Sequence, residues 1–455
     1  MDSRKITLDS ALTLVAAYLG LFVGLVDANA VNLALPAVRT DLGGGISGAQ
    51  WTIDAYNVTF AALLLTSGSL GDRFGRRRLL RVGLTLFVVA SLACATTPSL
   101  PVLLAARAVQ GIGAALMLPQ GLAIAAAAFP DSIQRGRATA AWAIAAAMST
   151  AIGPILGGVL TDTAGWRYIF WLNIPVGFLA LLMTYRYLPE SRDHGASRID
   201  VRGQTLAVVG LAALTVVLVE GRSMSASGVA VLALCAVASM AAFVHSQRRS
   251  ATPMLPLDLF RSRRLNAALF ATFAMTFGIY GLLLVNSFVF QQQRGVSAVE
   301  TAIWFLPMPL TYLVLIPLVN ALAHRTGPRL PMTAGMGLMA AGLLLYAVAG
   351  PHADVWLLEL SFVLAGAGLA LNTGPAVGLA MAAVPLQRAG LAASVVNLAR
   401  LVGITVGVAV LGSAMAAVGV QAAMAVGGTV QLIGTAVAWR GTRADTGATK
   451  EVCHA

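Results

Sequence analysis

Long apolar segments alternate with short polar breaks along nearly the whole chain. Each apolar segment is about 20 residues long, the length of an α-helix that crosses the hydrocarbon core of a bilayer. The short alternating segments of a β-barrel are not seen. Because a helix satisfies its own backbone hydrogen bonds in a membrane, the pattern predicts fourteen spanning helices. They are expected at residues 10–34, 49–70, 79–97, 101–127, 138–161, 167–188, 203–219, 226–245, 266–290, 298–322, 330–349, 354–382, 390–413 and 420–439.

Composition and charge place these helices in a membrane with a defined orientation. Hydrophobic residues make up 58% of the chain and charged residues 11%, which excludes an ordinary soluble protein. The net charge of +12 would suggest a nucleic-acid partner in a soluble protein, but here the bases lie in short loops, so no nucleic acid is expected. Of 30 basic residues, 24 fall on the side that holds both termini and four on the other. The positive-inside rule therefore predicts cytoplasmic termini. The heavy use of Arg over Lys and the abundance of Ala resemble the coding bias of a GC-rich bacterium, so the expected location is a bacterial plasma membrane.

Two loop sequences repeat and divide the chain. LGDRFGRR at residues 70–77 and LAHRTGPR at residues 322–329 share leucine, arginine, glycine and arginine at matching offsets. Such a repeat indicates an all-α polytopic membrane protein built from two similar halves. The expected parts are an N-terminal six-helix half, an inserted helix pair, a C-terminal six-helix half and a cytoplasmic tail, at residues 1–190, 191–250, 251–440 and 441–455.

The first repeated loop lies in the segment GSLGDRFGRRRLL, residues 68–80. Glycine permits tight turns, Asp72 can accept hydrogen bonds, and the arginines can pair with it or with lipid headgroups. The segment resembles the loop signature of the major facilitator superfamily, whose fold has two pseudo-symmetric six-helix halves. A loop that only sets topology is the alternative. The resemblance implies a conformational switch formed by Gly68, Gly71, Asp72, Arg73, Gly75, Arg76 and Arg77.

A second motif, AIGPILGG at residues 151–158, lies in the predicted fifth helix. Its glycines allow close helix packing, and its proline removes one backbone donor. The motif is similar to the signature of the superfamily's antiporters, which implies export and assigns a role to Gly153, Pro154, Gly157 and Gly158. Packing alone explains the same residues.

Three further stretches resemble the fourteen-helix drug/proton antiporter branch of EmrB and QacA type, including methylenomycin-resistance exporters. They are LVDANAVNLALP, RAVQGIGAALMLP and WRYIFWLNIPVG, at residues 25–36, 107–119 and 166–177. The linker PMLPLDLFRSRR, residues 253–264, fits the same branch. His324 departs from it by replacing the acid of the second-half loop, and the loop before the last helix is short.

Ionisable side chains inside predicted helices are costly and mark functional sites or ion pairs. Asp27, Asp54 and Arg107 all lie in the outer half of their helices, where they could share one cavity. A carboxylate that alternates between buried and wetted positions can carry a proton, so these three residues are the candidates for proton coupling. A permanent Asp27–Arg107 ion pair between helices is the structural alternative.

Other residues inside the helices are candidates for substrate contact. Glu359 and Arg400 are ionisable, Asn32 could line a cavity and Met117 could form an apolar wall. Packing and hydrogen bonds between helices explain the same residues equally well.

These features favour a secondary active transporter over an enzyme. The two lysines lie near the chain ends, which excludes a phosphate loop for ATP, and no histidine lies where a membrane-embedded enzyme or metal site would need it. The resemblance implies a monomeric drug/proton antiporter that needs a proton gradient and no cofactor or metal. Its expected substrates are small lipophilic drugs or antibiotics, and a cationic substrate is one of the possibilities. Transport of an endogenous metabolite and a non-transporting scaffold remain the alternatives.

Overall fold

The computed structural model describes residues 8–128, 132–190, 200–250, 253–384 and 388–442, so the predicted tail lies almost entirely outside the described residues. These residues form fifteen α-helices, a 3-10 helix η1 (Leu257–Arg261) and a π-helix η2 (Val289–Gln293). The α-helices are α1 (Leu8–Leu42), α2 (Gly45–Phe74), α3 (Arg76–Ala95), α4 (Leu100–Ala128), α5 (Ser132–Thr163), α6 (Arg167–Tyr187), α7 (Val201–Glu220), α8 (Ala226–Arg249), α9 (Arg263–Phe288), α10 (Ala298–Phe305), α11 (Pro307–Thr326), α12 (Arg329–Ala349), α13 (Val355–Ala382), α14 (Ala389–Val418) and α15 (Val420–Gly441).

The helices agree with the predicted segments, with two differences. The predicted segment 298–322 is broken into α10 and α11 at Leu306, because Pro307 and Pro309 supply no backbone N–H there. Within the described residues, thirteen segments are long and apolar enough to cross a membrane. The helix α2 is not among these thirteen, although it is 30 residues long. The structure therefore supports a helical membrane bundle without fixing the number of crossings at fourteen.

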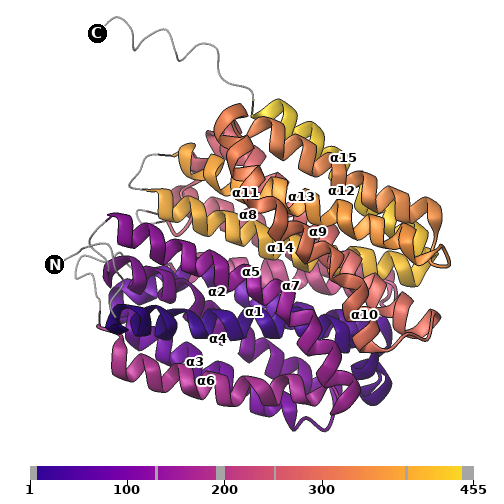
Figure 1. Cartoon of the computed structure of the whole chain (residues 1–455), viewed down its shortest axis with the longest axis horizontal. Helices are drawn as coiled ribbons and strands as arrows, with labels where there is room; N and C mark the ends of the chain where they lie inside the picture. Colours follow the sequence, from indigo (N-terminus) through magenta and orange to yellow (C-terminus); the bar gives the residue numbers. More distant parts are fainter. Residues whose placement is uncertain (1–7, 129–131, 191–199, 251–252, 385–387, 443–455) are drawn as a thin grey trace, which may run out of the picture.

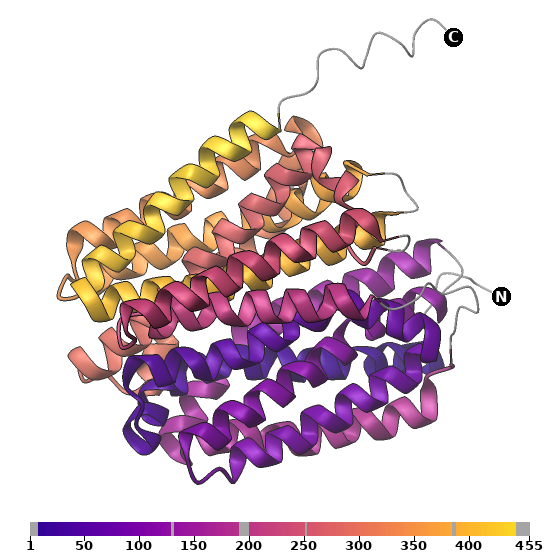
Figure 2. The ribbon, with the colours of Figure 1, turned by 180° about the vertical axis from the view of Figure 1, so that it is seen from behind.

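The helices gather into two groups that lie side by side (Figures 1 and 2). Helices α1 to α6 pack against one another, and helices α9 to α15 form the second group. The buried apolar side chains form two clusters, one mostly within each group, and residues of α9 and α14 join the cluster of the first group. The helix α7 packs against α2 and α14, one from each group, and α8 packs on α7.

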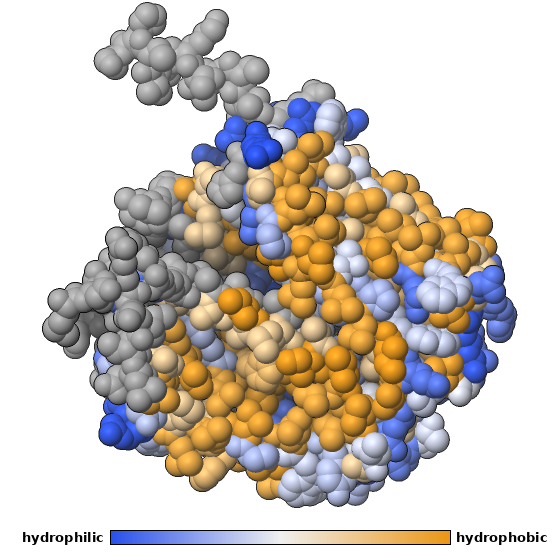
Figure 3. Space-filling view, in the orientation of Figure 1, coloured by the Kyte–Doolittle hydropathy of each residue, from blue (hydrophilic) through white to orange (hydrophobic). Residues whose placement is uncertain are grey.

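The outer surface is apolar where lipid would surround it. Hydrophobic side chains dominate the face shown in Figure 3, and hydrophilic ones gather toward the ends of the helices. The helix α8 is the most exposed span, with Val231, Leu234 and Val237 each about two-thirds exposed. An apolar surface of this extent needs lipid around it, which fits a multi-pass membrane protein.

The linker before α9 is tied to the second group at the basic end, which we define as the end that carries the α2–α3 turn. The 3-10 helix η1 contains Asp258, which forms a salt bridge with Arg388 at the start of α14. The hydrogen bond from Arg388 lowers the pKa of the Asp258 carboxyl.

The opposite end of the bundle, which we call the outer end, holds the two groups together by hydrogen bonds. Gln50 of α2 donates to the carbonyls of Val408 and Ala409 in α14, at 3.0 and 2.8 Å. Gln291 of η2 donates to the carbonyl of Leu33 in α1 at 2.9 Å. Asp162 of α5 accepts from two backbone N–H groups at the start of α10, at 3.1 and 2.7 Å. The outer end is therefore closed in this structure.

Replacing Asp162 with alanine should loosen this closure, because the first N–H groups of α10 then lose their acceptor across the two groups. An engineered cysteine at Ala302, which is 2% exposed, should react faster with a membrane-impermeant maleimide added from the outer side. Glu300→Ala is the matched control, since Glu300 caps α10 within α10 alone. Equal labelling in the Asp162→Ala and control proteins would show that Asp162 does not hold the outer end closed.

Candidate functional site

An ion pair between Asp27 and Arg107 lies at the centre of the first group. Asp27 of α1 accepts a hydrogen bond from Arg107 of α4 at 2.6 Å. The two side chains are 0% and 1% exposed, so water reaches neither. In this structure Asp27 and Arg107 form the ion pair between helices that the sequence offered as the alternative to proton coupling. A role for the pair in proton coupling stays a prediction.

Neutral polar side chains complete the hydrogen bonding of this pair. Asn173 of α6 donates to Asp27 at 2.7 Å, and Gln110 of α4 donates to it at 3.3 Å. Gln110 also accepts from Arg107 at 2.6 Å and donates to Ser91 of α3 at 2.9 Å. The network therefore joins α1, α3, α4 and α6, and a buried network with its partners in place makes a packing rigid.

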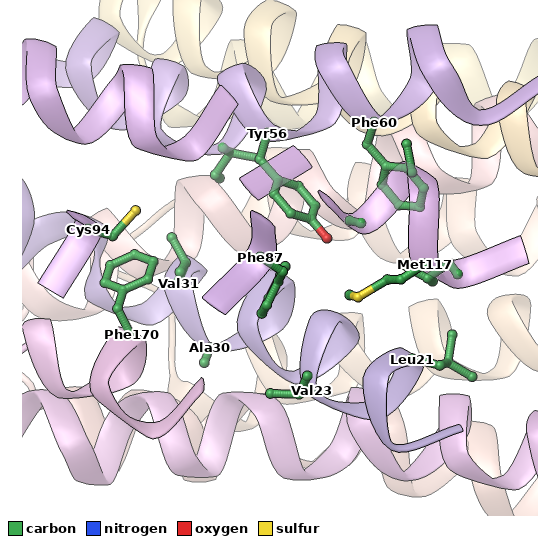
Figure 4. Packing of buried hydrophobic residues seen from close by; sticks show 14 of the residues in the cluster. Leu21, Val23, Ala30, Val31, Tyr56, Phe60, Phe87, Cys94, Met117 and Phe170 are labelled. Atoms are coloured by element: carbon green, nitrogen blue, oxygen red, sulfur yellow. The ribbon is translucent and has the colours of Figure 1, made fainter. Parts of the chain in front are cut away.

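Aromatic rings and a backbone carbonyl enclose the Arg107 guanidinium. Its Nε donates to the carbonyl of Thr52 in α2 at 3.0 Å. The guanidinium lies 4.6 Å from the ring centre of Tyr56 and 5.7 Å from that of Phe170. Such contacts stabilise a cation that water does not reach. Figure 4 shows Tyr56, Phe87 and Phe170 in this apolar surrounding.

Asp54 of α2 lies in a contrasting environment. It is 0% exposed, and neither of its carboxyl oxygens has a hydrogen-bond partner in the described part of the chain. Gln50 of α2 contacts the Val408 carbonyl of α14 near the outer end. Asp54 lies one helical turn from Gln50 on α2, and Thr405 lies about one turn from Val408 on α14, in both cases away from the outer end. Both residues therefore lie on the surfaces where α2 and α14 face each other. The hydroxyl of Thr405 is also buried and unpaired. An ionised carboxylate here would be buried with nothing to offset its lost hydration.

The four residues predicted to contact substrate lie on four different helices. Asn32 and Met117 are each 1% exposed, and the Asn32 amide donates to the Ala28 carbonyl of its own helix. Met117 fills the core beside Gly20 and Gly24. Glu359 of α13 is half-buried. Arg400 of α14 is half-buried, with its Nε unpaired. Their contact with substrate stays a prediction.

The signature loop forms a tight turn whose contacts stay within the first group. Gly75 joins α2 and α3 with a φ of +104°, which a residue with a side chain rarely adopts. Gly71 packs against Gln120 of α4, whereas an added Cβ at Gly68 would meet nothing within 4 Å. The close approach of α2 to α4 explains the first of these glycines.

The charged residues of the loop hold the basic ends of α3, α4 and α6 together. Asp72 pairs with Arg76 at 2.8 Å, and Arg76 donates to the Ala123 carbonyl at 3.3 Å. Arg77 donates to the Leu188 carbonyl at 2.8 Å, and Arg73 lies exposed against its neighbour Phe74. Within the described residues, the hydrogen bonds of Asp72 do not reach the second group. The side chain of His324, the counterpart in the second loop, lies outside the description.

The glycines of the predicted antiporter motif bring α5 against two other helices. An added Cβ at Gly153 would lie 2.6 Å from Asn29, and one at Gly157 would lie 2.5 Å from the Ala30 carbonyl, both in α1. An added Cβ at Gly158 would lie 2.6 Å from the Ala298 carbonyl of α10. Pro154 lies buried inside α5. The motif therefore forms both a packing surface within the first group and part of the outer closure.

Sequence reasoning did not identify Asn173 and Ser91 as members of the charged network. Asn173 lies within the quoted stretch WRYIFWLNIPVG, but uncharged residues in a helix carry no signal of what they contact. Glu220, the last residue of α7, accepts hydrogen bonds from Trp51 at 2.9 Å and from Ser47. Trp51 lies in another helix, α2, so its approach could not be deduced from the neighbours of Glu220 in the sequence.

The structure is that of a polytopic helical membrane protein, with two helix groups, an apolar outer surface and enclosed charges. The sequence matches the profile of the Major Facilitator Superfamily over residues 17–408, with a second match over residues 268–451. The chain belongs to this superfamily. It is a transporter and not an enzyme.

Within the superfamily, the chain is similar to proteins named for drug and antibiotic resistance. The chain is 38% identical over 408 residues to the Multidrug resistance protein Stp of Mycobacterium tuberculosis (strain CDC 1551 / Oshkosh), covering 89% of this chain and 76% of that one. It is 34% identical to the Methylenomycin A resistance protein of Bacillus subtilis (strain 168), covering 88% and 86%. The fold matches a POT family transporter crystallised with 5-aminolevulinic acid, with a TM-score of 0.71 at 16% identity over 95% and 96% of the two chains. The predicted resemblance to drug exporters of this superfamily is confirmed.

Breaking the central ion pair from one side should destabilise the protein more than removing both charges. Arg107→Gln or Asp27→Asn alone leaves a buried charge without its partner, a loss of about 3–5 kcal/mol. The double variant should unfold at a higher temperature than the two single losses predict when added, as measured by thermal unfolding in detergent. Additive losses would mean that the two charges do not stabilise each other.

Proposed function

We propose that this chain is a proton-coupled exporter of small lipophilic compounds that works by alternating access between its two helix groups. Family membership supports transport, and the names of the relatives, which include multidrug resistance and methylenomycin resistance, support export of drugs or antibiotics. The proton gradient would supply the energy, with no bound cofactor.

The observation that carries the proposal is the position of Asp54. Its carboxyl group is enclosed without a partner where α2 meets α14, one turn from the Gln50 contact that closes the outer end. A proton on Asp54 removes the charge that could not be buried there. Opening the outer end separates α2 from α14 and gives Asp54 access to water, so its proton would be taken up on one side and released on the other.

The Asp27–Arg107 pair would serve the same cycle from the first group. While the outer end is closed, Arg107 and the amide donors satisfy Asp27. When the cavity faces outward and the pair loosens, Asp27 would come into contact with water and so with protons. We therefore assign proton coupling to Asp54, Asp27 and Arg107, with Asp54 as the residue whose surroundings demand a proton in the closed structure.

In the proposed architecture fourteen segments cross the membrane: the thirteen that are long and apolar enough, and α2. Its 30 residues, packed against α4, α7 and α14, support this assignment. The halves would be residues 1–190 and 251–440, with the inserted pair at 191–250. The basic end would face the cytoplasm with both termini, as the positive-inside rule favours. A monomer would suffice, because both groups belong to one chain.

The charges at the centre set what the substrate could be. A cationic lipophilic drug would compete with a proton for Asp54 or Glu359, whereas Arg400 would favour an anionic compound. Met117 and Asn32 would add apolar and polar contact. We propose a cationic lipophile as the first compound to test, since competition between drug and proton for a carboxylate gives antiport directly.

Proton-coupled efflux of a fluorescent cationic drug from everted membrane vesicles tests the proposal. Asp54→Asn should abolish drug-induced proton release, because the amide cannot exchange a proton, while expression persists. Asp354→Asn is the matched control, since Asp354 is exposed and its side chain caps no helix.

Three outcomes would count against parts of this proposal. Unchanged proton release in Asp54→Asn, with loss of release in Asp27→Asn, would move the coupling to Asp27. Drug efflux without proton movement in the native protein would contradict antiport. Absence of efflux by the native protein would contradict a cationic drug as substrate and point to a metabolite.

A second test concerns the signature loop, which we propose acts as a conformational switch at the basic end. Asp72→Ala frees Arg76, which bridges to α4, and should slow turnover with little change in drug affinity, because Asp72 lies far from Asp54 along α2. Transport rate and equilibrium drug binding are measured on the same vesicles. Loss of binding would contradict the switch.

A further inference from the structure

A groove of about 490 Å³ opens on the side of the first group at the basic end. It is lined by Arg78, Arg81, Val82, Thr85 and Leu86 of α3, and by Tyr185 and Glu190 at the end of α6. The groove is remote from the central ion pair, and the functions proposed above make no use of it.

The chemistry of the groove changes along its length. Arg78 and Arg81 supply positive charge close to the turn, and Val82 and Leu86 follow on α3 toward the middle of the bundle. Val82, Val89 and Leu182 are exposed by 44%, 59% and 52%, so the surface that continues from the groove is apolar. A cationic mouth followed by an apolar wall is complementary to an anionic headgroup followed by an acyl chain.

One of the two arginines in the groove, Arg81, is held in place by an aromatic ring. The Arg81 guanidinium lies 3.7 Å from the ring centre of Tyr185, and its Nε is buried with no hydrogen-bond partner in the described residues. Stacking on an aromatic ring fixes the plane of a guanidinium and leaves its edge free to bind a phosphate. The planar donor edge of arginine matches two phosphate oxygens.

The one acid in the groove is already engaged. Glu190 accepts from the backbone N–H of Arg77 at 3.0 Å and lies 4.0 Å from the Arg77 side chain. Asp72, on the preceding turn, pairs with Arg76. Among the described residues, no ion pair is formed by Arg78 or Arg81, so the groove keeps an excess of positive charge.

We propose that this groove is a binding site for an anionic phospholipid, with the headgroup phosphate held by Arg81 and Arg78 and one acyl chain along Val82 and Leu86. A lipid fits better than a soluble phosphate compound, because the groove opens onto an apolar surface at the level where headgroups meet hydrocarbon. Bound lipid would join the basic ends of α3 and α6, beside the signature loop.

Native mass spectrometry of the purified full-length protein in detergent tests the site, with dioleoylphosphatidylglycerol as the probe. The affinity for the first bound lipid should fall on the order of tenfold or more in the double variant Arg78→Gln, Arg81→Gln. The matched control is Arg248→Gln, Arg249→Gln, which removes the same charge from exposed residues at the basic end of α8. Equal affinity in the native and groove variants would overturn the proposal.

A second pair of variants keeps all the charges. Tyr185→Phe retains the ring under Arg81 and should bind lipid like the native protein, whereas Tyr185→Leu removes the stacking and should bind more weakly. If both variants bound the lipid equally weakly, stacking on the Tyr185 ring would not be what holds Arg81 in place.

Two ligand controls identify the source of the phosphate. Dioleoylphosphatidylcholine should bind the native protein more weakly than the anionic lipid, and equal binding would mean that the groove takes any lipid. Inorganic phosphate at millimolar concentration should not displace the lipid. Displacement would overturn the lipid assignment in favour of a soluble phosphate compound. Each outcome leaves the export proposal untouched, since transport is measured separately.

Discussion

A charge that is removed from water without a partner is strongly destabilising, and the surroundings of the two carboxylates Asp27 and Asp54 and of Arg107 follow from that constraint. Asp27 and Arg107 meet the constraint by pairing, with amide groups of Asn173 and Gln110 filling the remaining positions. Among the described residues Asp54 has no such partners, and we propose that a bound proton lets it stay buried. The first group would then hold one charge that is neutralised by pairing and one that is neutralised by protonation.

Close approach of backbones sets where the two groups can meet. Gly158 lets α5 touch α10, and Asp162, one turn further along α5, receives the N–H groups at the start of that helix. The same helix uses Gly153 and Gly157 against α1. Neighbouring turns of α5 therefore contribute in two ways to closure of the outer end. Gly158 has no side chain and lets the helices touch, and the Asp162 carboxylate accepts the hydrogen bonds between them.

The sequence was sufficient for the helices, the superfamily and the charged residues in the membrane, because hydropathy and loop charge act locally and the motifs are contiguous. It could not show which charges meet. Asp27 and Arg107 are 80 residues apart, and their pairing depends on the packing of α1 on α4. Likewise, nothing near Asp54 in the sequence shows that its neighbours leave it unpaired. Two prolines next to Leu306 are a local signal for the break between α10 and α11. The prediction missed the break because the apolar segment continues without interruption on both sides of these prolines.

The inserted pair is attached unequally to the two groups. The helix α7 is bonded to α2 near both of its ends, through Gln204, which donates to the Ala62 carbonyl at 2.6 Å, and through Glu220, which accepts from Trp51. Among the residues that the structure describes, one hydrogen bond joins α7 to α14, donated by Ser413 to the Leu218 carbonyl at 2.8 Å. If α2 and α14 part, as the proposed alternating access requires, α7 and α8 would move with the first group. The moving bodies would then be unequal, α1 to α8 against α9 to α15, and the body that carries the exposed helix α8 would have the greater contact with lipid and the greater viscous drag.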